Sequence, residues 1–214
     1  TGLVGSRRTE VVEAIYGITK LDKGHVCLNG KEIHVKGPRH AMELGIGLLP
    51  EDRQQQGLIL DWGLGRNVTL PVMKDISKKG ITDEAKERSL SKNLLETVGV
   101  KALSIFDKAS SLSGGNQQKV VVAKQLASKL KVIILDEPTK GVDVGAKAAI
   151  YEIIGELAKQ GYAIILISSE MPEILGLCDR VVVMCEGRVT GEFDRREVSQ
   201  EKILEKAMAK RTIG

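Results

Sequence analysis

Two short strings in this sequence carry residue types suited to phosphate chemistry. LSGGNQQ occupies residues 112–118, and VIILDEP occupies residues 132–138. In the first string, a short turn opens onto a helix that we expect to begin near Gly115. The unpaired backbone N–H groups and the positive end of such a helix face outward, where they can meet a phosphate group. The complete seven-residue string is specific, whereas an apolar strand with an acidic end occurs in many proteins.

The second string reads as a buried strand that ends in two carboxylates, Asp136 and Glu137. At such a strand end, Asp136 would hold Mg²⁺ through water. Glu137 would orient or deprotonate the water molecule that attacks the γ-phosphate of ATP. The apolar residues before the pair and the Pro-Thr after it favour this interpretation over an ordinary solvated strand end.

The start of the sequence, GLVGSRRTE, matches a phosphate loop with two replacements. In the pattern GxxxxGK[ST], glycines let the backbone curl with its N–H groups inward, the lysine reaches the terminal phosphates and the hydroxyl binds Mg²⁺. Gly2 and Gly5 keep their places, and Thr9 supplies the hydroxyl. Arg7 stands where the second required glycine belongs, and Arg8 replaces the lysine.

Both replacements should weaken the binding of nucleotide. If the position of Arg7 demands a positive φ, an arginine there costs on the order of 1 to 2 kcal/mol relative to glycine. Arg8 keeps the charge, but its longer, planar head cannot act as a compact point charge. The residues assigned to nucleotide binding are Gly2, Gly5, Ser6, Arg7, Arg8, Thr9 and Glu10.

The composition indicates an α/β protein with no strong preference for nucleic acid. The 214 residues are 42% hydrophobic and only 3% aromatic, so aliphatic residues must fill a core of the kind found in a parallel sheet between helices. The net charge of +4 is too mild to argue for nucleic acid. Three cysteines without metal-site spacing suit reduced thiols in a cytosol.

The order of expected elements implies a mostly parallel sheet, because strands and helices alternate after the first string. A small antiparallel hairpin region lies near the start, and a helical segment is inserted before the first string. The expected elements are a helix at 10–16, a hairpin at Asn29-Gly30, a helix from Pro38 to about Gly45, a strand at 46–50, a polar loop at 51–57, helical stretches at 66–73 and 83–99, a helix from Gly115, strands at 131–135 and 162–168, helices at 145–160 and 171–177, a hairpin at Glu186-Gly187 and a helix at 199–210.

Three further features have a structural and a functional interpretation. One face of the first hairpin carries His25, Cys27, Glu32 and His34, which could ligate zinc or copper, but a polar hairpin face needs no metal. Asp143 fits either a contact loop between paired domains or the N-cap of the following helix. Trp62 fits a packing role better than a contact with a partner.

LSGGNQQ, LDEPTKGVD and ISSEMPE together resemble the second ATP-binding cassette of bacterial monosaccharide importers, the ribose and galactoside uptake ATPases in which two cassettes are fused. GLVGSRRTEVVEAIYG and EDRQQQG are also similar to that second half, so the resemblance covers essentially the whole chain. It implies the P-loop ATPase fold of ABC nucleotide-binding domains, with ATP and Mg²⁺ as cofactors. It also implies one domain over 1–214, divided into an ATPase core at 1–63 and 131–214 and a helical subdomain at 64–130.

In that family two cassettes face each other head to tail, so each ATP lies between the phosphate loop of one and the signature of the other. By this resemblance the signature would close over an ATP held by a first cassette of the same polypeptide or by a second copy. The signature residues are Leu112, Ser113, Gly114, Gly115, Asn116 and Gln117.

The chain's own site departs from the family pattern at two more positions. Glu51 stands where a glutamine is usual, and Ser169 stands where a histidine beside the γ-phosphate is expected. A carboxylate repels a triphosphate unless metal lies between them, and a serine hydroxyl is shorter than an imidazole, so both changes weaken hydrolysis. Ser169 is equally well explained as a polar residue at a strand end.

The resemblance implies a peripheral ATPase at the cytoplasmic face of the bacterial cell membrane. Its partners would be membrane permease subunits and, indirectly, a periplasmic or lipid-anchored sugar-binding protein, with no nucleic acid. Two alternatives are a regulatory nucleotide-binding half with negligible hydrolysis of its own, and a soluble, non-transport ABC ATPase. The resemblance also implies a strand before Gly2, and that strand is missing from this sequence.

Overall fold

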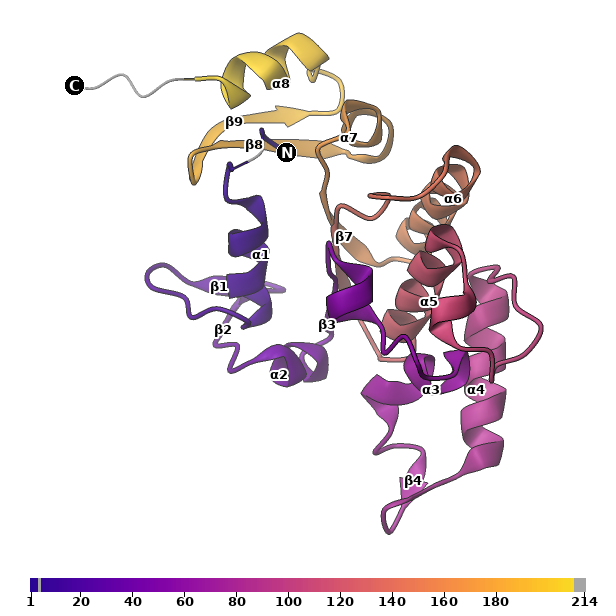
Figure 1. Cartoon of the computed structure of the whole chain (residues 1–214). Coiled ribbons are helices and arrows are strands. Elements are labelled where there is room, and N and C mark those ends of the chain that lie inside the picture. The colour runs from indigo at the N-terminus through magenta and orange to yellow at the C-terminus, as the bar shows by residue number, and fades with distance from the viewer. Residues whose placement is uncertain (4, 210–214) are drawn as a thin grey trace. The chain divides into compact units, whose positions relative to one another are not determined.

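The chain, as a computed structural model, is described over residues 1–3 and 5–209. Its residues form two compact units. The first unit joins Thr1–Ala41 to Leu166–Gly214, and the second unit is Met42–Ile165. Helices and strands alternate along most of the chain, as Figure 1 shows.

The first unit contains two antiparallel hairpins whose turns were predicted from the sequence. β1 (Val26–Leu28) pairs with β2 (Lys31–Ile33), and β8 (Arg180–Cys185) pairs with β9 (Arg188–Asp194). Both central residues of each turn, Asn29-Gly30 and Glu186-Gly187, have a positive φ. This is the backbone of type I′ turns, which match the twist of the strands they join.

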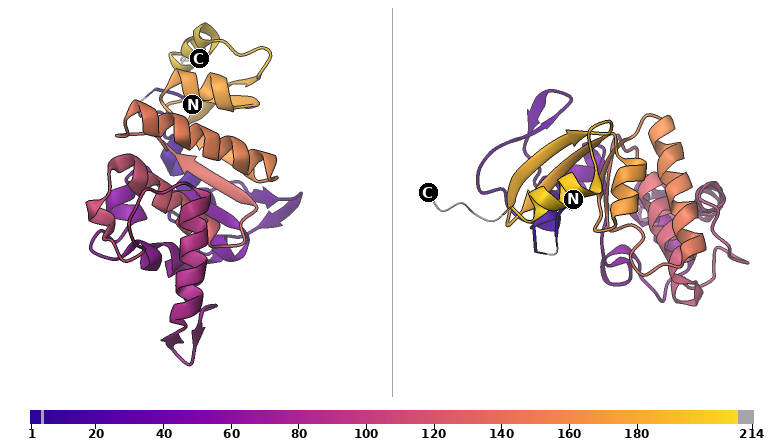
Figure 2. Two further views of the ribbon diagram at one scale, coloured as in Figure 1. Left: turned by 90° about the vertical axis from the view of Figure 1, so that its right-hand side faces the viewer. Right: turned by 90° about the horizontal axis from the view of Figure 1, so that it is seen from above.

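Four helices complete the described part of the first unit. They are α1 (Arg8–Tyr16), α2 (Pro38–Glu43, which continues into the second unit), α7 (Met171–Leu177) and α8 (Gln200–Ala207). Helix α8 lies along the β8–β9 hairpin, which Figure 2 shows from above. The buried side chains that join α7, β8 and α8 are those of Ile174, Val181, Val183, Ile203 and Ala207.

The second unit is built around a parallel pair of strands. β3 (Ile46–Leu49) pairs in parallel with β6 (Val132–Asp136), from Ile46 opposite Val132 to Leu49 opposite Leu135, in a sheet of order β3-β6-β7. All four residues of β3 are buried. The sequences of β3 and β6 are continuous apolar runs, as expected for strands covered on both faces.

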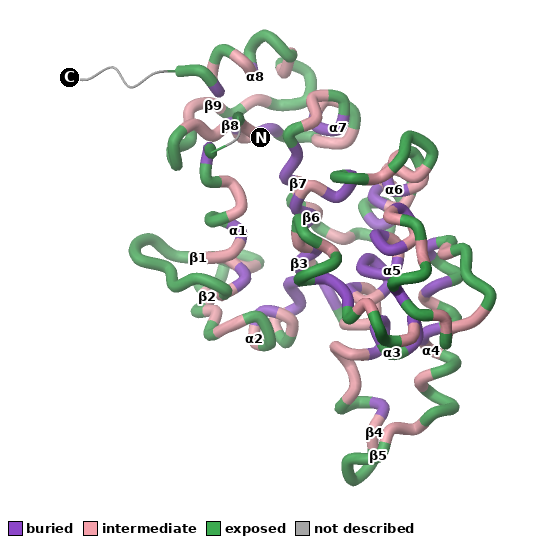
Figure 3. Tube along the Cα trace, viewed as in Figure 1, coloured by how far each residue is buried: buried purple, intermediate pink, exposed green. Residues whose placement is uncertain are grey.

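The helices and short elements of the second unit follow the expected order. They are the π-helix η1 (Arg53–Gly57), α3 (Leu64–Thr69), the 3₁₀ turn Leu70–Val72, β4 (Ser77–Lys78), β5 (Ile81–Thr82), α4 (Glu84–Thr97), the 3₁₀ turn Ala109–Ser111, α5 (Gly114–Leu126), α6 (Val144–Lys159) and β7 (Ala163–Ile167). Helix α5 is largely buried, whereas the β4–β5 hairpin is mainly exposed (Figure 3).

The α/β fold with a parallel sheet and antiparallel hairpins is therefore confirmed, with local corrections. The 51–57 loop contains a single π-helical turn, because the Asp52 carboxylate accepts hydrogen bonds from the N–H groups of Gln54 and Gln55. The helix expected at 66–73 ends at Thr69, because Pro71 cannot continue an α-helix.

Two further differences are a hairpin that was not expected and the end of the last helix. The β4–β5 hairpin, which turns at Lys79-Gly80, was missed because strands of two residues leave almost no periodic signal. The last helix begins after the N-cap Ser199 and ends at Ala207, and the expected end at 210 lies outside the described residues. Within the described part of the chain, no helix has the length and apolar content needed to cross a bilayer.

The core position of Ile134 in β6 gives a first prediction. Ile134 is 0% exposed, so Ile134→Ala should lower the free energy of unfolding by about 2 to 5 kcal/mol through lost burial and the cavity left behind. Urea unfolding followed by circular dichroism measures this change. The exposed Ile81 in β5 is the matched control, and Ile81→Ala should shift stability by no more than about 0.5 kcal/mol. Equal losses for the two variants would contradict the assignment of the core.

Candidate functional site

The signature residues lie at the start of α5, in the second unit. Ser113 is the exposed N-cap residue, and the helix begins at Gly114, one residue earlier than expected. The Ser113 side chain makes no capping hydrogen bond to the helix in the described structure. Its Oγ instead accepts a bond of 3.1 Å from Nδ2 of Asn116. The hydroxyl that would normally satisfy an N–H group of the first turn is thus used elsewhere, and the helix end keeps its capacity for an anion.

Close packing explains why two glycines open this helix. A Cβ atom on Gly115 would lie 2.3 Å from Cβ of Ala146. A Cβ atom on Gly114 would lie 2.7 Å from Nη2 of Arg53 and 3.1 Å from the carbonyl oxygen of Gly141. A larger residue at Gly115 would therefore push α5 away from α6, and one at Gly114 would displace the Arg53 guanidinium.

The remaining signature residues anchor the start of α5. The N–H group of Leu112 donates to the Ala109 carbonyl at 3.3 Å, and Nε2 of Gln117 donates to the same oxygen at 3.1 Å. Oδ1 of Asn116 accepts a bond of 2.9 Å from the N–H group of Lys101. These polar groups are used inside the unit, so they fix the orientation of the helix end.

The two carboxylates predicted at the end of β6 occupy different environments. Asp136 is buried, with 2% exposed, and closes the strand. Glu137 is half-buried and has a φ of 46°, a left-handed conformation that is uncommon for a residue with a side chain. Backbone strain of this kind is concentrated at active sites and ligand clamps, which is in keeping with the role expected for Glu137.

The loop after this strand end is joined to the segment that contains Glu51. Nζ of Lys140 lies 2.5 Å from Oε1 of Glu51. The hydrogen bond and the charge of Glu51 raise the pKa of Lys140, and the nearby charges of Glu137 and Asp136 act in the same direction. The structure thus brings three of the predicted site carboxylates around one ammonium group, and Glu51 is partly neutralised by Lys140.

Two residues of this cluster, Arg53 and Lys140, were not identified from the sequence. Arg53 donates through Nη1 to the carbonyl of Lys140 at 2.8 Å and through Nη2 to the carbonyl of Gly141 at 3.2 Å. The charged residues in EDRQQQG and the lysine that follows LDEPT were available signals. Their partners are almost ninety residues apart in sequence, and pattern reasoning does not pair residues over such a distance.

Asp143 is the N-cap of α6. Its Oδ1 accepts a bond of 2.9 Å from the N–H group of Ala146, and the backbone at Asp143 is extended. The helix-capping alternative is therefore confirmed as a structural role, and a contact with a paired domain stays a prediction.

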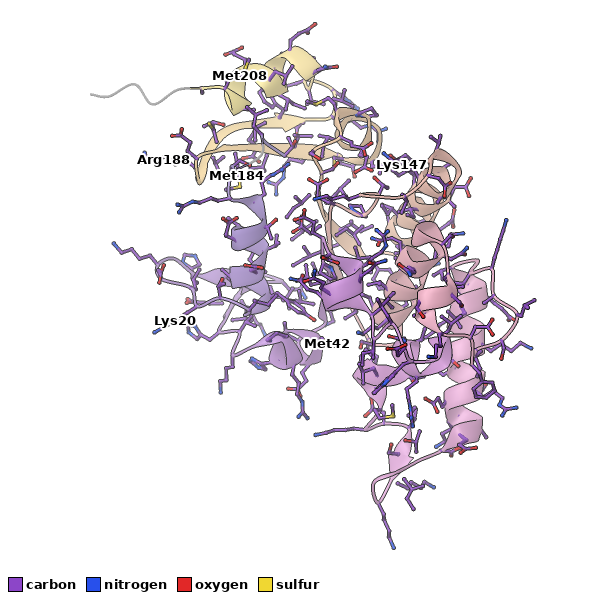
Figure 4. All side chains as sticks on the ribbon, viewed as in Figure 1. Lys20, Met42, Lys147, Met184, Arg188 and Met208 are labelled. Carbon is purple, nitrogen blue, oxygen red and sulfur yellow. The ribbon has the colours of Figure 1, made fainter. Side chains whose placement is uncertain are left out.

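The predicted phosphate loop lies in the first unit and is packed against β8 and the turn that follows it. Gly2 forms a parallel bridge with Met184, a residue labelled in Figure 4, and a Cβ on Gly2 would lie 2.3 Å from the Met184 carbonyl. The carbonyl of Ser6 accepts a bond of 3.1 Å from the N–H group of Gly187. Gly5 has a φ of 83°, as a loop glycine should.

One polar atom of this loop suits an anion. Oγ of Ser6 is buried and has no hydrogen-bond partner among the described residues. A buried hydroxyl without a partner costs free energy, and an incoming phosphate oxygen would satisfy it. This hydroxyl is therefore one donor that fits a phosphate group.

Arg7 adopts the backbone conformation for which glycine is preferred. Its φ is 65° and its ψ is 36°, immediately before α1 begins at Arg8. The predicted strain depended on a positive φ at this position, and the structure has one. The arginine here therefore carries a strain of about 1 to 2 kcal/mol.

Arg8 is held by the strand end that precedes α7. Its Nη1 donates to the carbonyl of Ser168 at 2.9 Å, in a partly buried position. Ser168 is fully buried, whereas its neighbour Ser169 is exposed. Thr9 and Glu10 follow in the first turn of α1, where Thr9 is half-buried and Glu10 is exposed.

The remaining sequence candidates are the first hairpin and Trp62. Cys27 lies opposite Glu32, as expected, but the described residues contain no group of three or more His, Cys, Asp or Glu side chains placed to hold a metal ion. The guanidinium carbon of Arg66 lies 5.7 Å from the ring centre of Trp62, which is 37% exposed. Trp62 thus makes a cation–π contact within its own unit.

Comparison with known proteins points to one family. The family model described as "ABC transporter" matches residues 1–140. The chain is 48% identical over 206 residues to a ribose import ATP-binding protein of Lactococcus lactis subsp. cremoris (96% of this chain, 42% of the relative). It is 49% identical over 209 residues to a putative ribose/galactose/methyl galactoside import ATP-binding protein of Rhizobium meliloti (98% and 42%). The chain thus spans about two fifths of the length of these curated relatives.

A solved structure supports the fold. A nucleotide-free ATP-binding cassette from an ABC transporter superimposes with a TM-score of 0.82 and 23% sequence identity, covering 98% of this chain and 86% of the other. At this identity the likeness shows the fold alone.

The strained backbone of Arg7 gives a second prediction. Arg7→Gly should raise the free energy of unfolding by about 1 kcal/mol, because glycine adopts a φ of 65° without a Cβ clash. Thermal unfolding at several scan rates would measure the gain. Arg7→Ala keeps the clash and should bring no such gain, and equal gains for both variants would attribute the effect to the lost charge.

Proposed function

The chain belongs to the ABC transporter family, and from this premise we propose that it is an ATP-binding and ATP-hydrolysing cassette that energises import of a monosaccharide. Its signature would serve the ATP of a partner cassette, while its own phosphate loop is degenerate. The observation that carries the proposal is the exposed start of α5, where Ser113 leaves the helix end available to an anion.

The electrostatics of α5 support a phosphate ligand. The helix runs over 13 residues, from Gly114 to Leu126, so its dipole places partial positive charge at the exposed end. Preorganised N–H groups aimed at developing negative charge stabilise a transition state without reorganising. The network around Gly114, Gly115 and Asn116 supplies that preorganisation.

The chain's own site would retain part of the machinery. By the motif pattern, Asp136 and the hydroxyl of Thr9 are each candidate ligands of Mg²⁺, which supplies neutralising charge for the phosphate oxygens when it is bound. Glu137 would orient or deprotonate the attacking water. Ser169 would stand at the position beside the γ-phosphate, with a shorter reach than a histidine.

Three features support weak or absent turnover in this site. Arg7 strains the loop backbone, and one guanidinium nitrogen of Arg8 is held by the Ser168 carbonyl. Glu51 stands where the family has a glutamine, and its carboxylate is paired with the ammonium group of Lys140. We propose that most of the chemistry takes place at the partner's nucleotide.

The names of the relatives suggest the wider assembly. Ribose and galactoside import ATP-binding proteins about twice as long as this chain support a partner cassette in the same polypeptide, with a second copy as the alternative. We propose permease subunits as membrane partners, an indirect role for a periplasmic or lipid-anchored sugar-binding protein, and a position at the cytoplasmic face of the membrane. The ATPase core would comprise 1–63 and 131–214, and a helical subdomain at 64–130 would pass movement to the permease together with the 51–62 segment.

A second candidate function is a regulatory half that binds nucleotide with negligible hydrolysis. The bond between Arg8 and the Ser168 carbonyl favours it, because this bond holds one guanidinium nitrogen on the protein's own backbone. The two candidates differ in whether this site turns ATP over.

The signature assignment gives a third prediction. Ser113→Arg should reduce sugar-stimulated ATP turnover of the assembled transporter by about 100-fold or more, because a long side chain would cover the helix end. Phosphate release from transporter reconstituted in vesicles measures this rate. Ser110→Arg, an exposed substitution three residues earlier, should leave the rate within about twofold. Full activity of the Ser113→Arg transporter would contradict the proposed role of the signature.

The degenerate loop gives a fourth prediction. The double substitution Arg7→Gly with Arg8→Lys restores the pattern GxxxxGK[ST] and should tighten the binding of a labelled ATP analogue by about tenfold or more. Fluorescence titration of the parent chain and the double variant measures both affinities. Unchanged affinity would show that the two arginines do not limit nucleotide binding. Arg188→Lys, a surface change in β9, is the control for altered charge type.

A further inference from the structure

We propose that Arg53 is a positioning residue that clamps the start of α5 to the loop Lys140–Gly141, so that these segments move as one body. This inference rests on the proposed function, because it assigns a role in placing the signature. It adds a residue that belongs to neither the phosphate loop nor the signature.

The geometry of the guanidinium carries the proposal. One nitrogen donates to the carbonyl of Lys140 at 2.8 Å, and the other donates to the carbonyl of Gly141 at 3.2 Å. The second nitrogen also fills the space beside Gly114, where a Cβ would lie 2.7 Å away. A planar fork can bridge two successive carbonyls in this way, whereas a lysine ammonium is a single point charge.

The backbone that carries Arg53 is itself fixed to α5. Nε2 of Gln54 donates to Oε1 of Gln117 at 3.1 Å, and Nζ of Lys124 donates to the carbonyl of Gly57 at 2.9 Å. Burial lowers the pKa of Lys124, which is half-buried. Both ends of the η1 turn are therefore tied to the signature helix.

The far side of the clamp leads to α6. The loop that Arg53 grips continues to Asp143, which caps α6 through the N–H group of Ala146. The methyl group of Ala146 in turn packs against Gly115. A displacement of the 51–57 segment would therefore shift the signature end and the loop before Asp143 together, instead of moving either one alone.

The first test separates positioning from folding. In the assembled transporter, Arg53→Met should lower kcat for ATP about tenfold while KM changes less than about twofold, because the loss acts on alignment and not on nucleotide capture. Arg53→Lys should recover part of the rate, since it retains the charge and one donor. Lys108→Met, which removes an exposed cation from a surface ion pair with Asp61, should leave kcat unchanged.

The second test examines the contact without any catalytic readout. Gly114→Ala should lower the urea midpoint of the chain, because its methyl group needs the space of the Arg53 guanidinium. In the Arg53→Ala background this loss should shrink, with a coupling of about tenfold in the unfolding equilibrium constant. Gly115→Ala is the matched control. Its loss should be relieved by Ala146→Gly and not by Arg53→Ala.

The outcomes distinguish this inference from the proposed function. If Ser113→Arg abolishes turnover while Arg53→Met retains kcat within twofold, the clamp is wrong and the proposed function stands. If Arg53→Met lowers only the folded fraction, with kcat per folded molecule unchanged, the residue is merely structural and the inference is overturned. Additive losses for Gly114→Ala and Arg53→Ala would overturn the contact itself.

Discussion

The second unit depends on the close approach of α5 to the loop and helix that follow β6. At Gly115 the approach leaves no room for a Cβ atom, and at Gly114 the space is filled by Arg53. Glycine at both positions has a further effect, because the first two residues of the helix carry no side chain that could shield their N–H groups. The same packing therefore leaves a positively polarised helix end, which is the basis of the anion site that we propose. The same glycines satisfy a steric constraint and an electrostatic one.

The phosphate loop of the first unit shows what remains when such a requirement is relaxed. The backbone keeps the left-handed conformation at Arg7 and the close contact between Gly2 and Met184, so the path of the loop survives the loss of its second glycine. The side chains have changed roles. Arg8 donates to a carbonyl of its own unit, and its charge contributes to internal structure. The backbone path expected of a phosphate loop is thus present, and the weaker chemistry that we propose for it rests on the side chains of Arg7 and Arg8.

Local signals explain which parts of the structure could be predicted from the sequence. Asn29-Gly30 and Glu186-Gly187 specify their turns within two residues, and the apolar run before Asp136 specifies a buried strand, so the hairpins, β6 and the α/β class followed directly. The clamp at Arg53 could not be predicted in this way, because its acceptors are backbone carbonyls about ninety residues away that carry no sequence signature. Roles at the nucleotide likewise depend on a partner that one chain cannot specify.

Gly114 and Gly115 serve both the packing of α5 and the proposed phosphate site. This dual role affects how a cassette sequence changes after gene duplication. A cassette that lost every role in transport would still unfold more readily if either glycine acquired a side chain. Selection for a stable fold alone would then preserve Gly114 and Gly115. These two glycines therefore report on the packing of α5 as well as on a phosphate site.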